Sequence, residues 1–202
     1  MAARSAATAV AYPHRTRRRL ETRDRVFDAA LREFRRAGVS AAQIEDIVRA
    51  ADVARGTFYL HFPTKDHVLL ELLRRRQTVI ATRLRAARAL SPRSFLRRVV
   101  DLMLEDTLGH GRGLWHELVA VVARHATEMR REPSALVEAM TGFFAAAQQR
   151  RDVRQDVTPS ELTAVFLPGV YGLLQMKLDE PTAQLRAALH RVVDIFVRGI
   201  AP

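Results

Sequence analysis

The stretch that most constrains the fold runs from Gln43 to Phe62, QIEDIVRAADVARGTFYLHF. Its first half carries apolar residues at helical spacing, Ile44, Ile47, Val48 and Ala51. Such spacing turns one stripe of a helix inwards. Asp52 follows where the chain must reverse, and Asp tolerates a left-handed turn better than most residues with a Cβ. The stretch therefore predicts two short helices joined by a tight turn, either a helix-turn-helix that fits a DNA major groove or an ordinary helical hairpin.

The continuation of this stretch, ARGTFYLHFPTKDHVLL from Ala54 to Leu70, resembles the signature of the TetR family of transcriptional regulators. In that family the string S-[RK]-G-[TS]-[FL]-Y-x-[HY]-F-x-[SN]-K-[ED] follows an A-G-V turn. The residues that match it here are Arg55, Gly56, Thr57, Phe58, Tyr59, His61, Phe62, Lys65 and Asp66. Residues 21–38 and 39–53 are similar to the first and second helices of the family. The resemblance covers about the first third of the chain.

Two positions depart from the family pattern. Asp52 replaces the usual glycine of the turn, and Ala54 replaces the usual serine that caps the second helix of the motif. An alanine at an N-cap costs about 0.5–2 kcal/mol of helix stability. The start of the recognition helix is therefore expected to lack its side-chain cap.

The composition excludes several kinds of protein. A chain of 202 residues can form one large or two small domains with a real core. The absence of Cys excludes disulfides, thiolate metal sites and cysteine catalysis. No apolar run approaches the roughly 20 residues that span a bilayer, and the first residues do not form a signal peptide. We expect a cytoplasmic protein that has no membrane partner.

The net charge of +11 is unevenly placed, with the positive excess in residues 1–131 and near neutrality beyond them. A basic N-terminal part indicates a polyanionic partner at one end of the chain. An arginine-rich genome would produce the same bias without such a partner. The charge therefore supports binding to double-stranded DNA without establishing it.

Helical periodicity runs through the whole chain, which predicts an all-α protein of about nine helices. Residues 1–20 are expected to form a basic flexible arm that ends in Arg15, Arg17, Arg18 and Arg19. Such an arm could reach a minor groove or phosphates, or it could be a solvated tail. Residues 21–66 are expected to form the DNA-binding domain, with the helix-turn-helix at 43–62. Residues 67–202 are expected to form a helical ligand-binding and dimerisation domain.

Capping and breaking residues place the individual helices. The first is expected at 23–37, closed by Gly38, with Phe58, Leu60 and Phe62 packing the motif against it. A long helix is expected at 65–89, with its arginines, Arg76 among them, in solvent. Ser91-Pro92, Pro133 and Thr158-Pro159 predict later helix starts. The segment 109–113 is expected to break one helix, and Pro168 to interrupt and kink another. The last helix is expected at 182–199.

Catalytic patterns are missing. His116-Glu117 begins like the zinc-protease pattern H-E-x-x-H, but Ala120 stands at the second ligand position. No glycine string follows a strand, so neither a dinucleotide fold nor a P-loop is supported. We therefore expect no enzyme activity, no cofactor and no metal site.

The DNA contacts divide into two groups. Arg55 and Thr57, with the intervening Gly56, are expected to face base edges or nearby phosphates, and Gln43 could contribute from the start of the preceding helix. Tyr59, His61 and Lys65 are expected to bind backbone phosphates, which fixes register but carries no sequence information.

Resemblance to the TetR family further implies a small-molecule pocket and a homodimer. The candidate pocket residues are Met103, Trp115, Phe143, Phe144, Phe166, Tyr171 and Met176, which favour an apolar or aromatic effector. The last two helices have wide apolar faces suited to a dimer interface, or to covering their own core. The prediction is a ligand-responsive repressor that binds a palindromic operator as a dimer. The alternatives are a non-specific basic nucleic-acid-binding protein, or a helical carrier or enzyme that retains the helix-turn-helix scaffold.

Overall fold

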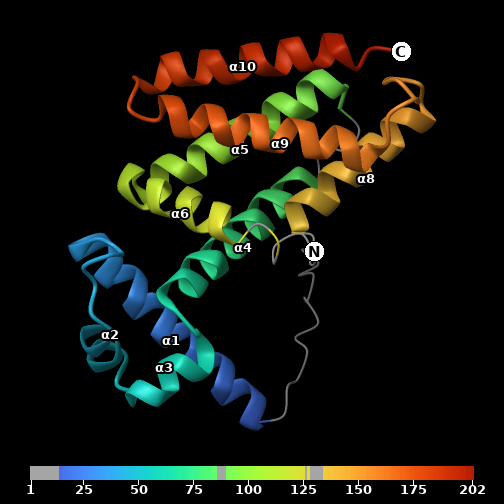
Figure 1. The fold of residues 1–202 in the computed structure, drawn as a ribbon. Coiled ribbons are helices and arrows are strands. Elements are labelled where there is room, and N and C mark those ends of the chain that lie inside the picture. The colour runs from blue at the N-terminus through green and yellow to red at the C-terminus, as the bar shows by residue number, and fades with distance from the viewer. Residues whose placement is uncertain (1–13, 86–89, 126, 128–133) are drawn as a thin grey trace, which may run out of the picture. The chain divides into compact units, whose positions relative to one another are not determined.

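A computed structural model describes residues 14–85, 90–125, 127 and 134–202. Within these ranges all regular structure is helical, which confirms the predicted all-α class (Figure 1). The chain divides into two compact units, residues 1–68 and 69–202. Nine helices lie in the described part of the chain.

The first unit contains α1 (His14–Ala37), α2 (Ile44–Ala51) and α3 (Arg55–His61). Its core is aromatic, because Phe58 and Phe62 are buried and their ring centroids lie 6.2 Å apart. The ring of Phe27, on α1, lies 6.4 Å from that of Phe62. Phe34, two turns further along α1, is also buried. These contacts hold the helix-turn-helix on α1.

Two turns depend on left-handed backbone conformations. Gly38 ends α1 with φ of 81°. Asp52 ends α2 with φ 51° and ψ 57°, the left-handed conformation expected for it from the sequence. Ala54 is the N-cap of α3 and provides no side-chain hydrogen bond, so the predicted missing cap is confirmed. The prediction for Leu60 is wrong, because its side chain is 69% exposed. Leu60 lies one position past Tyr59 on a helix whose buried side is occupied by Phe58.

The expectation of an unstructured arm is wrong for residues 14–20, which form the start of α1. Arg and Leu are good helix formers, and Arg17 pairs with Glu21 one turn later at 3.5 Å. Thr22 therefore lies inside the helix and does not cap it. The remainder of the predicted arm, residues 1–13, lies outside the described residues.

The second unit contains most of α4 (Lys65–Leu84) and five further helices. These are α5 (Pro92–His110), α6 (Arg112–Arg124), α8 (Ala135–Gln149), α9 (Pro159–Lys177) and α10 (Thr182–Gly199). α10 packs on α5 and lies beside α9, and α9 also packs on α8 and α6 (Figure 1). α4 starts in the first unit and continues without interruption into the second.

The predicted caps of the second unit are largely confirmed. Ser91 and Thr158 are N-caps followed by proline, and Thr158 forms a full capping box with Glu161. Pro133 lies outside the described residues, and the N-cap of α8 is Ser134. The break within 109–113 is confined to Gly111, which has φ of 90°. α4 is described as helix only to Leu84, and residues 86–89 of its predicted extension are not described.

The predicted interruption at Pro168 does not occur, because α9 is one helix from Pro159 to Lys177. Pro168 cannot donate to the carbonyl of Ala164. Both residues are exposed, so water can satisfy that carbonyl. The helix therefore tolerates proline on its outer face.

Arg76 is also placed differently from the prediction. Only 4% of it is exposed, and its guanidinium forms an ion pair with Asp106 on α5. Leu72 and Ile80, four residues away on either side, are buried on the same face of α4. Arg76 therefore belongs to the core of the second unit.

Candidate functional site

The outer face of α3 is open. Arg55, Gly56 and Tyr59 are exposed and Thr57 is half-buried. A Cβ built on Gly56 would meet no protein atom within 4 Å. Packing inside the protein therefore does not require glycine there, although close approach by a partner from outside would. The sequence prediction that these residues face outwards agrees with their exposure.

Arg55 has two partners within the first unit. Its guanidinium pairs with the carboxylate of Glu45 on α2, and Nη2 lies 3.5 Å from the hydroxyl of Tyr59. The guanidinium carbon is 5.9 Å from the centroid of the Tyr59 ring. Hydrogen bonding to Tyr59 and the charge of Glu45 raise the pKa of Arg55 above its usual value. The arginine expected to read bases is thus held on the α3 face by contacts that solvent can reach.

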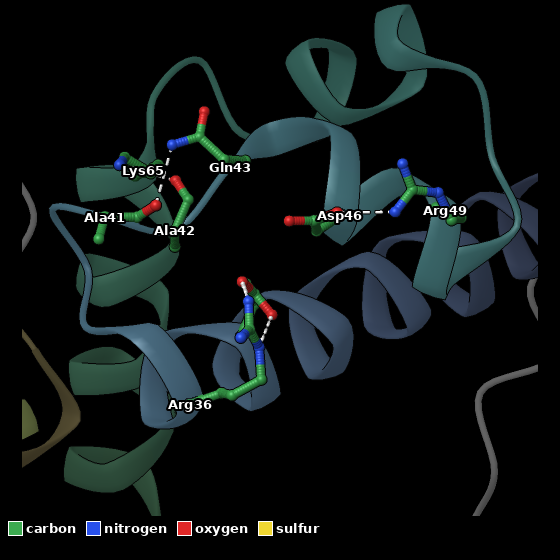
Figure 2. Close-up of polar contacts among 8 residues, drawn as sticks. Arg36, Ala41, Ala42, Gln43, Asp46, Arg49 and Lys65 are labelled. Atoms are coloured by element: carbon green, nitrogen blue, oxygen red, sulfur yellow. Dashed lines mark hydrogen bonds and ion pairs between the residues drawn. The ribbon is translucent and has the colours of Figure 1, made fainter.

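Lys65 is engaged inside the first unit. Its Nζ donates to the backbone oxygens of Val39, Ser40 and Ala42, at 2.7, 2.8 and 3.1 Å. An ammonium has three donors, so all of them are used. Figure 2 shows Lys65 beside the loop that contains Ala41 and Ala42. Lys65 therefore ties the start of α4 to the loop between α1 and α2, and these bonds compete with the predicted phosphate contact, which stays a prediction.

Gln43 precedes α2 as its N-cap residue, but its side chain does not cap the helix. Its amide nitrogen donates to the backbone oxygen of Ala41 at 2.9 Å (Figure 2). The side chain is exposed, so a partner could compete for this single bond. Its predicted role in DNA contact stays a prediction.

His61 ends α3 beside the N-terminal half of α1. Partial burial, and then the charges of Arg19 and Arg23, lower the pKa of His61 below its usual value. Arg23 also lies over the ring of Phe62, 4.9 Å from its centroid. Sequence reasoning assigned Arg19 to a flexible arm and gave neither Arg23 nor Glu45 a role. The helical spacing of Arg19 and Arg23 is the signal that could have placed them on one face.

The seven predicted pocket residues do not form one site. Phe143, Phe144 and Phe166 lie in an aromatic core with Phe95 and Phe196. In this core Phe143 stacks on Phe95 with centroids 3.6 Å apart, and Phe166 lies 5.0 Å from Phe196. The prediction for Met176 is wrong, because this side chain is 82% exposed on α9. It lies on the outer side of a helix whose inner side carries Phe166.

Met103, Trp115 and Tyr171 do meet at a cavity, which has a volume of ≈10 Å³. Its walls come from α4, α5, α6 and α9, and include the Arg76–Asp106 ion pair. The Trp115 ring stacks on Tyr171 with centroids 5.6 Å apart.

Two further polar features mark this cavity. Gln77 Nε2 donates to the Tyr171 hydroxyl at 3.0 Å, and burial raises the pKa of that tyrosine. The Arg76 guanidinium carbon lies 5.5 Å from the centroid of the Trp115 ring. Sequence reasoning missed the polar half of the cavity, because it placed Arg76 in solvent and gave Gln77 no role.

Other candidate chemistry is not assembled in the described part of the chain. His116 Nδ1 lies 3.1 Å from the amide nitrogen of Gln175, which is a hydrogen bond and not a metal site. No group of three His, Asp or Glu residues that could hold a metal ion is found among the residues that the structure describes. Within the same residues, no helix combines the length and apolar character that crossing a membrane requires.

Comparison with known proteins gives consistent matches. The family model "Bacterial regulatory proteins, tetR family" matches residues 26–72. A second, "Transcriptional regulator SbtR-like, C-terminal domain", matches residues 91–202. The chain is 30% identical over 175 residues to the HTH-type transcriptional regulator AcrR of Shigella flexneri, covering 80% of each protein.

Solved structures share the fold. The TetR-family repressor FadR of Thermus thermophilus, in complex with lauroyl-CoA, gives a TM-score of 0.71 at 23% identity. That match covers 89% of this chain and 95% of FadR. RolR in complex with resorcinol gives a TM-score of 0.65 at 17% identity, covering 93% of this chain and 98% of RolR. At these identities the likeness shows the fold alone.

Proposed function

The chain belongs to the TetR family of transcriptional regulators, and we propose that it is a repressor that binds a palindromic operator as a dimer and is released by a small apolar or aromatic effector. The observation that carries this proposal is α3, an uncapped short helix whose outer face exposes Arg55, Gly56 and Tyr59. A second helix of this kind is the element that enters the major groove in helix-turn-helix proteins.

The contacts to DNA follow from what α3 exposes. The Arg55 side chain is 62% exposed and that of Glu45 is 50% exposed. The guanidinium can therefore leave Glu45 and bind the edge of a guanine instead. Thr57 and Gln43 are the other candidates for base contact. Tyr59 and His61 lie in the C-terminal half of α3 and would bind phosphates. Arg19 and Arg23, near His61, add positive charge on the same side.

The proposed dimer uses the outer face of α9 with α10. Val165 and Met176 on α9 and Ile195 on α10 are large apolar side chains with most of their surface exposed. The α9 positions between Val165 and Met176 that face outwards are Pro168, Gly169 and Gly172. Small and apolar residues let two helices approach closely, and exposed apolar patches mark interaction sites. Two recognition helices about 34–36 Å apart would read successive major grooves.

The proposed response to effector runs through α4. This helix carries four residues of the cavity wall, from Leu73 to Ile80, and starts at Lys65 in the first unit. An effector that enters the cavity would shift α4 and change the spacing of the two recognition helices. It need only favour the DNA-incompetent spacing by about 1–3 kcal/mol to lower operator affinity 5–150-fold. The complexes of FadR with lauroyl-CoA and of RolR with resorcinol support the proposal of a small-molecule effector.

A fluorescence-anisotropy titration with the DNA upstream of the protein's own gene tests this proposal. The expected result is binding at physiological salt at least about a thousandfold tighter than to a random duplex of equal length. Equal affinity for both duplexes would indicate the non-specific alternative. Absence of DNA binding together with turnover or tight retention of a small molecule would indicate the carrier or enzyme alternative.

A further inference from the structure

Three buried polar atoms have no hydrogen-bond partner among the residues that the structure describes, and all three belong to residues of the same cavity wall. They are Arg76 Nη2, Thr107 Oγ1 and Trp115 Nε1. The three residues come from α4, α5 and α6 and are 4%, 1% and 3% exposed. Buried polar groups in folded proteins are nearly always paired, so three orphaned atoms at one place require an explanation.

These atoms share a chemical preference. The arginine nitrogen and the indole nitrogen can only donate, and the threonine hydroxyl can donate or accept. The Tyr171 hydroxyl accepts from Gln77, which leaves its own proton to donate. The missing partner is therefore an acceptor, and an oxygen with two lone pairs would serve more than one of the donors.

The charged residues in the cavity wall indicate which ligand charge the cavity favours. Among the residues that the structure describes, the charged residues that line the cavity are Arg76 and Asp106, which form an ion pair. Glu71, on the preceding turn of α4, is already paired with Arg74 and Arg75. An added carboxylate would be a buried charge without a counter-ion, which is unfavourable. A neutral acceptor avoids that cost.

The rest of the wall is apolar or aromatic. Leu73, Ile80 and Met103 supply aliphatic surface, and Trp115 with Tyr171 supplies stacked rings. A volume of ≈10 Å³ holds about one water molecule, so a larger ligand must push these side chains apart. Leu73 and Ile80 are on α4, so two of the side chains that must yield belong to the helix that leads to the first unit.

We propose that this cavity binds a small neutral aromatic compound that carries an acceptor oxygen, with the oxygen at Arg76, Thr107 and Trp115 and the ring against the apolar wall. This inference rests on the proposed function, because it names the chemical class of the effector. The oxygen takes the position that a single bridging water would otherwise occupy, and it reproduces that water's hydrogen bonds.

Trp115 is the only tryptophan in the chain, so its emission reports on this cavity directly. The 202-residue protein is titrated with phenol, toluene and benzoate, with N-acetyltryptophanamide as the control for collisional quenching. Phenol is neutral at neutral pH, because its pKa is close to that of tyrosine, about 10. We expect a saturable change with phenol, binding of toluene about 3- to 10-fold weaker, and no saturation with benzoate.

Thr107→Val tests the polar contact without an expected loss of folding, because the hydroxyl has no partner to lose. We expect phenol to bind about 3- to 10-fold more weakly and toluene to bind as before. Thr163→Val is the matched control, since Thr163 is 2% exposed, bonds Thr141 at 3.2 Å and is not in the wall. Circular dichroism checks that both variants are folded.

The outcomes separate this inference from the proposed function. No saturable phenol response, or equal binding of phenol and benzoate, overturns the inference. Release of the operator by phenol without any change in Trp115 emission also overturns it, while supporting the regulator. Saturable, Thr107-dependent phenol binding that leaves operator affinity unchanged supports the ligand class and overturns the proposed coupling through α4.

Discussion

The guanidinium of Arg55 on α3 is paired with the carboxylate of Glu45 on α2, ten residues earlier in the chain. Both side chains are at least half exposed, so the pair lies in solvent and is weak. Arg55, the residue proposed to read a base, therefore has a competing partner, Glu45, within the protein. In the proposed operator complex, an acceptor on DNA replaces Glu45 as the partner of Arg55.

Arg55→Ala should weaken operator binding roughly tenfold to a hundredfold and relax the preference for operator over random DNA. The reason is that a guanidinium contact to a base edge is lost only in the specific complex. Anisotropy titrations with both duplexes measure the change. Arg150→Ala is the matched control, because Arg150 in the second unit forms a similar exposed pair with Asp152 at 2.7 Å. An unchanged specificity ratio for Arg55→Ala would show that Arg55 does not read bases.

Glu45→Gln should strengthen binding to both operator and random DNA by about two- to fivefold, since it frees Arg55 and removes a negative charge near phosphates. Titrations at several salt concentrations measure this effect, and the gain should shrink as salt rises. Asp46→Gln is a suitable comparison, because Asp46 pairs with Arg49 and not with Arg55. A loss of affinity in Glu45→Gln would mean that the pair positions Arg55 for DNA instead of competing with it.

Lys65→Met should lower the free energy of unfolding of the first unit by about 2–3 kcal/mol, because three backbone oxygens lose their charged donor. Chemical denaturation measures this loss. Lys177→Met is the natural control, since Lys177 is the only other lysine and forms a half-buried pair with Glu180 at 2.6 Å. The salt dependence of DNA binding should keep its slope in Lys65→Met. A slope reduced by about one would restore the phosphate contact predicted from sequence.

Local chemistry made much of the first unit predictable. The spacing of Ile47 and Ala51 predicted the buried side of α2, and Asp52 was expected in the left-handed turn that it adopts. Ala54 was expected to start α3 without a side-chain cap, and it does. These features depend on residues within about one turn of one another, which sequence spacing describes directly.

Contacts between distant residues were not predictable in the same way. Lys65 reaches oxygens 23 to 26 residues earlier, and no local pattern distinguishes that arrangement from a phosphate contact. The ion pair of Arg76 joins residues 30 apart. Its burial did have a signal, since Arg76 stands four residues from both Leu72 and Ile80. A charged residue on an apolar stripe was read as solvated because the partner, Asp106, could not be identified from spacing.

His61 should make the stability of the first unit depend on pH. Its pKa is lowered in the folded protein by burial and by Arg19 and Arg23, so the unfolded chain binds the proton more tightly. Stability should therefore be complete above the unfolded value of about 6.5 and fall as pH drops below it. Thermal melts of the wild type and His61→Gln between about pH 5 and 8 measure the difference. Equal pH profiles for the two proteins would show that His61 does not titrate differently on folding.

Ala54→Ser should stabilise the start of α3. Ala54 has φ −71° and ψ 151°, the extended conformation of an N-cap residue, and its methyl group accepts no hydrogen bond. A serine hydroxyl there can accept from an amide of the first turn, which contributes about 0.5–2 kcal/mol. For a unit of this size the melting temperature should rise by about 4–8 °C per kcal/mol.

Ala41→Ser is the matched control for that rise, because Ala41 is exposed in the turn before α2 and is not an N-cap. It should leave the melting temperature within about a degree of the wild type, since surface substitutions away from caps have small effects. The serine at position 54 should also order the face that carries Arg55 before DNA arrives, so operator affinity should rise and not fall. A lower melting temperature in Ala54→Ser would mean that α3 begins at a different residue from Arg55.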